Sequence, residues 1–87
     1  LIQRAAAVMH TPSPATAEQL TRVHTHAHVD RLLALHGKSQ QLDPDTSVTP
    51  GSVHAARLAA GAALQAATHV MKHEGERAWA LTRPPGH

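Results

Sequence analysis

Apolar residues recur at helical spacing near the middle of the chain. Val29, Leu32 and Leu33 are separated by three and four positions, with charged residues between and beside them. Residues at such spacings share one helix face, so the pattern predicts a helix over about Thr25–His36 with its polar side toward water. Gly37 is well placed to end this helix, since glycine often follows a helix C-terminus.

Two shorter helical segments are expected before it. The alanine-rich stretch Ile2–Met9 predicts the end of a helix, which the proline-containing connector Thr11–Pro14 stops. Thr16 is a favourable N-cap, and Glu18 lies in the first turn, where the helix dipole favours negative charge. We therefore expect a short helix from Thr16 through Val23.

A polar segment without helical period, Lys38–Thr49, separates these helices from a longer one. We expect a loop there, and its length indicates a functional role. Pro50 suits the first turn of the following helix, with Thr49 as its cap, and Gly75 predicts where that helix ends.

The long helix carries an apolar stripe of mostly small residues. With Gly61, these residues permit close approach to a sheet or a second helix, which is a packing role. The stripe consists of Val53, Ala56, Ala60, Leu64, Ala67 and Met71.

The segment Arg77–Thr82 predicts a single β-strand near the C-terminal end of the chain. A lone strand has no hydrogen-bonding partner, so roughly two or more further strands are needed before a sheet is stable. Those strands must come from other sequence or another chain.

The composition predicts a marginal core. Trp79 is the only aromatic residue in 87, and alanine is frequent among the apolar residues. A chain of this length buries only about 60 to 65% of its unfolded surface. The chain starts with Leu1 rather than methionine, and its last residue falls inside a motif, so we expect a piece of a larger protein.

Charge and cysteine content disfavour several functional classes. The net charge is only +2, and the eight basic residues are spread along the chain, so no nucleic-acid partner is expected. Without cysteine, neither a disulfide framework nor a cysteine-based zinc site is possible. No secretory or membrane segment is evident, so we expect a cytoplasmic protein without a membrane partner.

Nine histidines raise the question of a metal site. Two pairs, His24 with His28 and His69 with His73, have the spacing that places both rings on one helix face. Neither pair has an obvious third ligand, unlike the HExxH pattern. We expect surface or packing histidines and no bound metal on this chain, with a histidine-based metal-binding protein as a weaker hypothesis.

The C-terminal motif RPPGH, Arg83–His87, has the character of a catalytic loop. It follows the expected strand, and the carboxyl ends of strands are where open α/β sheets place their chemistry. Two prolines stiffen the loop while glycine permits close approach of the backbone to a ligand. An imidazole such as that of His87 acts as base, acid or ligand.

RPPGH after an apolar strand resembles the motif of the histone deacetylase family, whose members are zinc-dependent deacetylases and acetylpolyamine amidohydrolases. The resemblance extends upstream to the acidic segment Leu42–Ser52, the helix His54–Ala67 and the segment Val23–Leu32, and it covers most of the chain. The order and spacing of these pieces also match. One departure is His28, where the family often has an aromatic residue.

The resemblance implies an α/β fold of the arginase/deacetylase type, with a parallel sheet flanked by helices. Residues 1–87 would be the incomplete N-terminal part of a single deacetylase domain. This piece is then expected to be mostly α-helical with one C-terminal strand.

The resemblance also implies roles for the C-terminal loop. His87 matches the first of two adjacent histidines that contact the metal-bound water and the developing oxyanion, and the second histidine is absent here. Arg83, Pro85 and Gly86 would belong to the pocket loop, although Arg83 could instead pair with a carboxylate.

The acidic segment offers two candidates for substrate binding. The resemblance places Asp45 near the family's rim aspartate, which accepts hydrogen bonds from the substrate backbone, and Asp43 is the close rival. Alternatively Asp43, Pro44 and Asp45 simply make a turn, because these residue types favour turns.

In the family, zinc polarises an amide carbonyl and activates water while a histidine transfers the proton. The family's zinc ligands, two aspartates and a histidine, lie beyond residue 87, so we expect this chain alone to be inactive. The complete enzyme would hydrolyse acetylated protein or small-molecule amides. The alternative is a helical module that self-associates into a homo-oligomer without catalysis.

Overall fold

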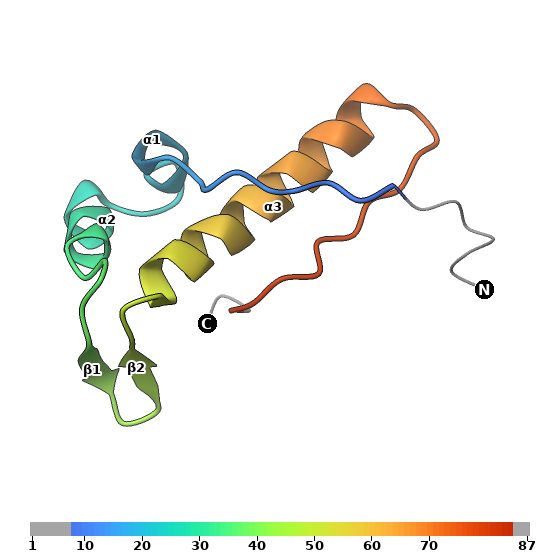
Figure 1. The fold of residues 1–87 in the computed structure, drawn as a ribbon. Coiled ribbons are helices and arrows are strands. Elements are labelled where there is room, and N and C mark those ends of the chain that lie inside the picture. Colours follow the sequence, from blue (N-terminus) through green and yellow to red (C-terminus); the bar gives the residue numbers. More distant parts are fainter. Residues whose placement is uncertain (1–7, 85–87) are drawn as a thin grey trace.

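The computed structural model describes residues 8–84, and most of the expected helix over Ile2–Met9 lies outside them. Three helices and one β-hairpin follow in chain order, and the longest helix forms the axis of the molecule (Figure 1). The elements are α1 (Ala17–Leu20), α2 (His26–Leu33), β1 (Gln40–Asp43), β2 (Thr46–Val48) and α3 (Ser52–Lys72).

The N-cap predicted at Thr16 is confirmed, and Thr25 plays the same part for α2 without having been predicted as a cap. The hydroxyl oxygen of Thr16 accepts a hydrogen bond from the backbone N–H of Gln19 at 3.1 Å, and the side-chain oxygen of Gln19 accepts one from the Thr16 N–H at 2.9 Å. This reciprocal capping box satisfies two N–H groups at the start of α1. Thr25 caps α2 by accepting a hydrogen bond from the His28 N–H at 3.1 Å.

Both short helices end earlier than expected. α1 ends at Leu20 rather than Val23, and α2 ends at Leu33 rather than His36, each continuing into turns. Gly37 closes the second set of turns with a φ of 76°, and its N–H donates to the carbonyl of Pro50 at 3.2 Å. The glycine therefore joins the end of α2 to the beginning of α3.

The expected loop over Lys38–Thr49 is instead a β-hairpin. β1 and β2 pair antiparallel, with Gln40 opposite Val48 and Gln41 opposite Ser47, and the register is irregular before Asp43. All four residues of β1 are exposed, so the apolar alternation that identifies a strand is absent from the sequence.

A small core lies where the hairpin meets the helices. Leu35, Val48 and Val53 are its buried residues, and Leu32 and Leu33 pack against them. Among the described residues no side chain is less than 2% exposed except small ones such as Ala15. The prediction of a marginal core is confirmed.

α3 begins two residues later than expected and ends three residues before Gly75. Gly51 is its N-cap, so the predicted roles of Thr49 and Pro50 are wrong, although Thr49 still donates its N–H to the Ser52 hydroxyl at 2.9 Å. The chain then turns at Gly75, which has a φ of 83°.

The predicted apolar stripe of α3 is correct in part, since Ala60 and Leu64 are half-buried. Val53 is buried, but Ala56, Ala67 and Met71 are exposed. Gly61 is buried because the segment around Ser13 crosses the helix there, so the predicted close approach occurs, with an extended segment rather than a sheet or helix.

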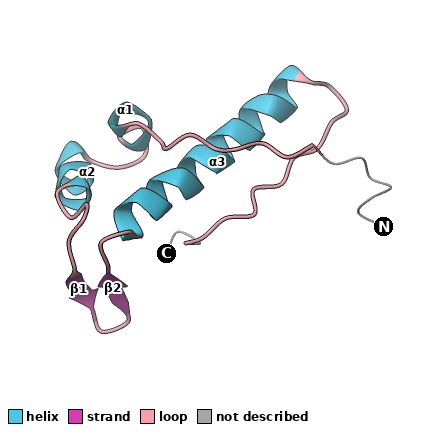
Figure 2. Ribbon diagram, viewed as in Figure 1, coloured by secondary structure: helices cyan, strands magenta, loops and turns pink. Residues whose placement is uncertain are grey.

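The predicted strand over Arg77–Thr82 is wrong for this chain. The segment has no regular structure and runs back from the end of α3 as loop (Figure 2), with Trp79 84% and Leu81 82% exposed. A strand needs hydrogen-bonding partners, and the described residues place none beside this segment.

Within residues 8–84, no helix has the length and apolar character needed to cross a membrane.

Candidate functional site

The two candidate aspartates lie at the tip of the hairpin. Asp43 ends β1, and Asp45 follows in the two-residue turn before β2. Oδ1 of Asp43 accepts a hydrogen bond from the Asp45 N–H at 2.9 Å, which is an Asx-type turn. The turn predicted for these residues is therefore present, and both side chains remain exposed to solvent.

The two aspartates differ in how their carboxylates are hydrogen-bonded. The carboxylate of Asp43 is engaged with the turn backbone, whereas no hydrogen bond within residues 8–84 holds the carboxylate of Asp45. A carboxylate without an internal partner is free to accept hydrogen bonds from a bound peptide. Asp45 is thus the better placed of the two for a ligand, and Asp43 is the residue that shapes the turn.

A shallow depression of about 370 Å³ lies beside the hairpin, between β1 and α2. Asp43 and Leu42 form one side, and Arg31 and His28 of α2 form the other. His28 and Asp43 thus line the same depression from opposite elements.

The C-terminal loop is described only in part. Arg83 is exposed, and within the described residues neither aspartate forms a hydrogen bond or ion pair with it. Pro85, Gly86 and His87 lie outside the described residues. Of the predicted catalytic loop, the structure therefore tests only Arg83, which is not bonded to either aspartate.

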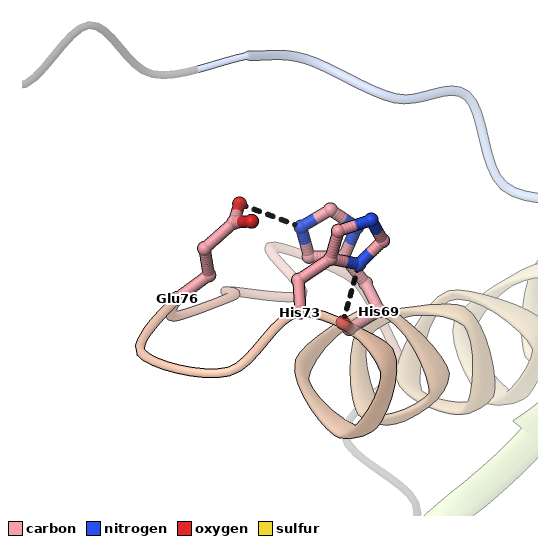
Figure 3. A group of neighbouring side chains, drawn as sticks. All are labelled: His69, His73 and Glu76. Atoms are coloured by element: carbon pink, nitrogen blue, oxygen red, sulfur yellow. Dashed lines mark hydrogen bonds and ion pairs between the residues drawn. The ribbon is translucent and has the colours of Figure 1, made fainter.

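A cluster that was not predicted lies at the C-terminal end of α3, comprising His69, His73 and Glu76. Figure 3 shows the two imidazole rings stacked and the Glu76 carboxylate turned toward His69. Nε2 of His69 lies 3.0 Å from Oε1 of Glu76, and Nδ1 of His73 donates to the backbone carbonyl of His69 at 2.9 Å.

Glu76 was missed because it follows the helix, so no helical spacing relates it to the histidine pair. The turn at Gly75 reverses the chain and returns Glu76 to the side of His69. Glu76 is therefore a potential third ligand for His69 and His73 that was not obvious from the sequence. The available signal in the sequence was Gly75, because a glycine shortly after a helix often reverses the direction of the chain.

The donor groups of the chain do not match the metal centre of the family. In residues 8–84, His69, His73 and Glu76 form the one group of three potential ligands whose donor atoms lie close together. The resemblance implies a centre of two aspartates and one histidine, whereas this group has two histidines and one glutamate. No catalytic step through a metal is therefore assigned to residues of this chain.

The chain is similar to known proteins along its whole length. The model of the histone deacetylase domain matches residues 1–87. A histone deacetylase-like amidohydrolase of Pseudomonas aeruginosa is 39% identical over 80 residues, covering 91% of this chain and 21% of the relative. A probable deacetylase of Archaeoglobus fulgidus is 40% identical over 80 residues, covering 92% and 22%.

A plant protein shows the same relationship. Histone deacetylase 8 of Arabidopsis thaliana is 38% identical over 79 residues, covering 88% of this chain and 21% of the relative. The chain thus spans about a fifth of the length of these curated relatives. No solved structure matches it.

Proposed function

The chain belongs to the histone deacetylase family, and from this we propose that it is the N-terminal part of the catalytic domain of a deacetylase. The observation that carries the proposal is the match of the family domain to all 87 residues. The reaction is hydrolysis of an acetyl amide, and the substrate is an acetyl-lysine side chain or an acetylpolyamine.

We propose that the complete domain has the arginase-like α/β fold, in which residues 77–82 join a parallel sheet flanked by helices. The exposure of Trp79 and Leu81 supports this, because a sheet would bury both apolar side chains. The segment also immediately precedes RPPGH, so strand formation would deliver the loop to the edge of the sheet.

His87 is proposed to exchange a proton during the reaction, since it occupies the first histidine position of the family motif. Asp45 is proposed to accept hydrogen bonds from the substrate backbone, supported by its unengaged carboxylate at the hairpin tip. Arg83, Pro85 and Gly86 would shape the pocket. Zinc in the complete enzyme would supply Lewis-acid activation of the amide and of water, and its ligands are not among the residues of this chain.

The chain alone is proposed to be inactive, and the complete enzyme to be cytoplasmic with acetylated substrates as partners. The competing function is a helical module that self-associates without catalysis. Its support is the exposure of Met71, Trp79 and Leu81, which a homo-oligomer would cover.

The test is acetate release from an acetyl-lysine peptide and from an acetylpolyamine by the complete protein that contains this chain. We expect activity on one of the two, with kcat/KM about 10²- to 10⁴-fold lower in His87→Ala and unchanged in the control His36→Ala. A chelator should abolish activity and zinc should restore it. A complete protein without activity on either substrate, but with a chain that sediments as an oligomer, would establish the module instead.

A further inference from the structure

The cluster at the end of α3 has the composition of a metal site. Imidazole nitrogens and carboxylate oxygens are common zinc ligands, and two histidines with one glutamate leave a fourth position for water. The three residues each offer one donor atom, and these atoms lie within 4.8 Å of one another. Tetrahedral zinc requires donor separations of about 3.3 to 3.5 Å, so the stacked imidazoles would have to rotate for the three donors to converge on one ion.

We propose that His69, His73 and Glu76 form a binding site for one divalent transition-metal ion, and that this ion is Zn²⁺. This site is separate from the catalytic centre proposed above, and its residues include neither His87 nor the hairpin aspartates. It also stands independently of the deacetylase proposal, because it depends only on the geometry of α3 and the turn that follows.

The hydrogen bonding prepares His73 as a ligand. A carbonyl oxygen only accepts, so Nδ1 of His73 carries the proton that is donated to the His69 carbonyl. In the neutral ring, the lone pair is then on Nε2. Such a bond from the second ring nitrogen to a carbonyl is the arrangement that orients metal-bound histidines in proteins.

His69 and Glu76 are also positioned before any ion arrives. Their 3.0 Å contact holds the carboxylate beside the imidazole, and an ion would take the place of the shared proton. Both remain accessible, with 32% of the His69 side chain and 54% of the Glu76 side chain exposed. The positive charge would also interact favourably with the C-terminal end of the α3 dipole.

A further histidine, His10 of the N-terminal segment, lies near the cluster but outside the group whose donor atoms are close together. The ring of His10 has its centroid 5.8 Å from that of His69, although it belongs to a part of the chain far away in sequence. The other histidine pair offers a contrast, because His24 and His28 are 5.0 Å apart between centroids but have no carboxylate in a comparable group within the described residues.

The experiment is calorimetric titration of the full 87-residue chain with zinc chloride at pH 7.5 in a buffer that does not chelate zinc. We expect one ion per chain with a dissociation constant in the low micromolar range or tighter. Glu76→Gln should weaken binding at least about tenfold, and the double variant His69→Ala, His73→Ala should abolish it. Glu74→Gln and the double variant His24→Ala, His28→Ala are the matched controls and should bind like the parent chain.

NMR of the unaltered chain locates the zinc site without variants, whose loss of binding could come from misfolding. Zinc should shift or broaden the amide NMR signals of residues 69–76 and leave those of the hairpin unchanged. Absence of one-to-one binding, equal loss in Glu74→Gln and Glu76→Gln, or zinc-induced shifts centred on His24 and His28 would each overturn the site. None of these outcomes concerns acetate release, so the site and the deacetylase proposal succeed or fail separately.

Discussion

Gly61 of α3 lies directly against the backbone carbonyl of Ser13. A Cβ built on the glycine would overlap the Ser13 oxygen and come within 3.0 Å of the Ala15 nitrogen. Beside this contact, Ala15 donates its N–H to the carbonyl of Arg57 at 2.9 Å, and Nε of Arg57 donates to the carbonyl of Ala15 at 2.9 Å. The missing side chain of Gly61 therefore allows an extended segment to be bonded to a helix.

Gly61→Ala should release this segment. Overpacking costs about 1 to 3 kcal/mol, which exceeds the gain of about 1 kcal/mol from replacing glycine in a helix interior. We expect a lower thermal midpoint for the chain and faster hydrogen exchange of the Ala15 N–H. Gly51→Ala is the control, since a Cβ there meets nothing within 4 Å, and its effect, limited to the poorer N-cap, should stay below about 1 kcal/mol. Equal effects of the two variants would contradict the packing role of Gly61.

Substituting the two hairpin aspartates should give different effects, on hairpin stability for Asp43 and on substrate binding for Asp45. Asp43→Ala removes the acceptor of the Asp45 N–H and should destabilise the hairpin by about 1 kcal/mol, whereas Asp45→Ala should change it by less than about 0.5 kcal/mol. Amide exchange in β1 and β2 measures both effects. In the complete enzyme we expect Asp45→Ala to raise KM with little change in kcat. A rise in KM for Asp43→Ala alone would reverse the assignment.

Trp79→Ala should have different consequences in the chain and in the complete domain. In the 87-residue chain the side chain is 84% exposed, so its removal should change the free energy of unfolding by less than about 0.5 kcal/mol. If residues 77–82 join a sheet, the same substitution in the complete domain should cost about 3 to 5 kcal/mol. Chemical denaturation of both proteins makes the comparison. A small effect in both would count against the proposed strand.

Local features of the sequence predicted much of the helical structure. The cap at Thr16 was predicted, because a hydroxyl accepts from N–H groups only a few residues away and needs no distant partner. The similar cap at Thr25 was not predicted, and the cap expected at Thr49 lies at Gly51 instead. The helix ends were less predictable. After Leu20 and Leu33, N–H groups such as those of Val23 and His36 donate to carbonyls three residues back rather than four, and no residue type marks that change.

Sequence patterns did not predict the hairpin or the cluster of His69, His73 and Glu76, and the reasons are related. β1 has no buried face, so it lacks the alternation that a half-buried strand shows. Its position follows from Val48, which joins Leu35 and Val53 in the small core. Glu76 reaches His69 only because the chain reverses at Gly75, a consequence of backbone conformation rather than of spacing.

The sequence by itself determined the family, because RPPGH and the segments before it are runs of adjacent residues whose order is visible without a fold. It also determined the cap at Thr16 and the prediction of a poor core, which depend on local hydrogen bonding and on composition. The tertiary structure decided which groups meet: Ser13 with Gly61, Asp43 with the Asp45 backbone, and Glu76 with His69. It also left residues 77–82 unpaired, because strand formation requires hydrogen-bonding partners that lie outside the segment itself.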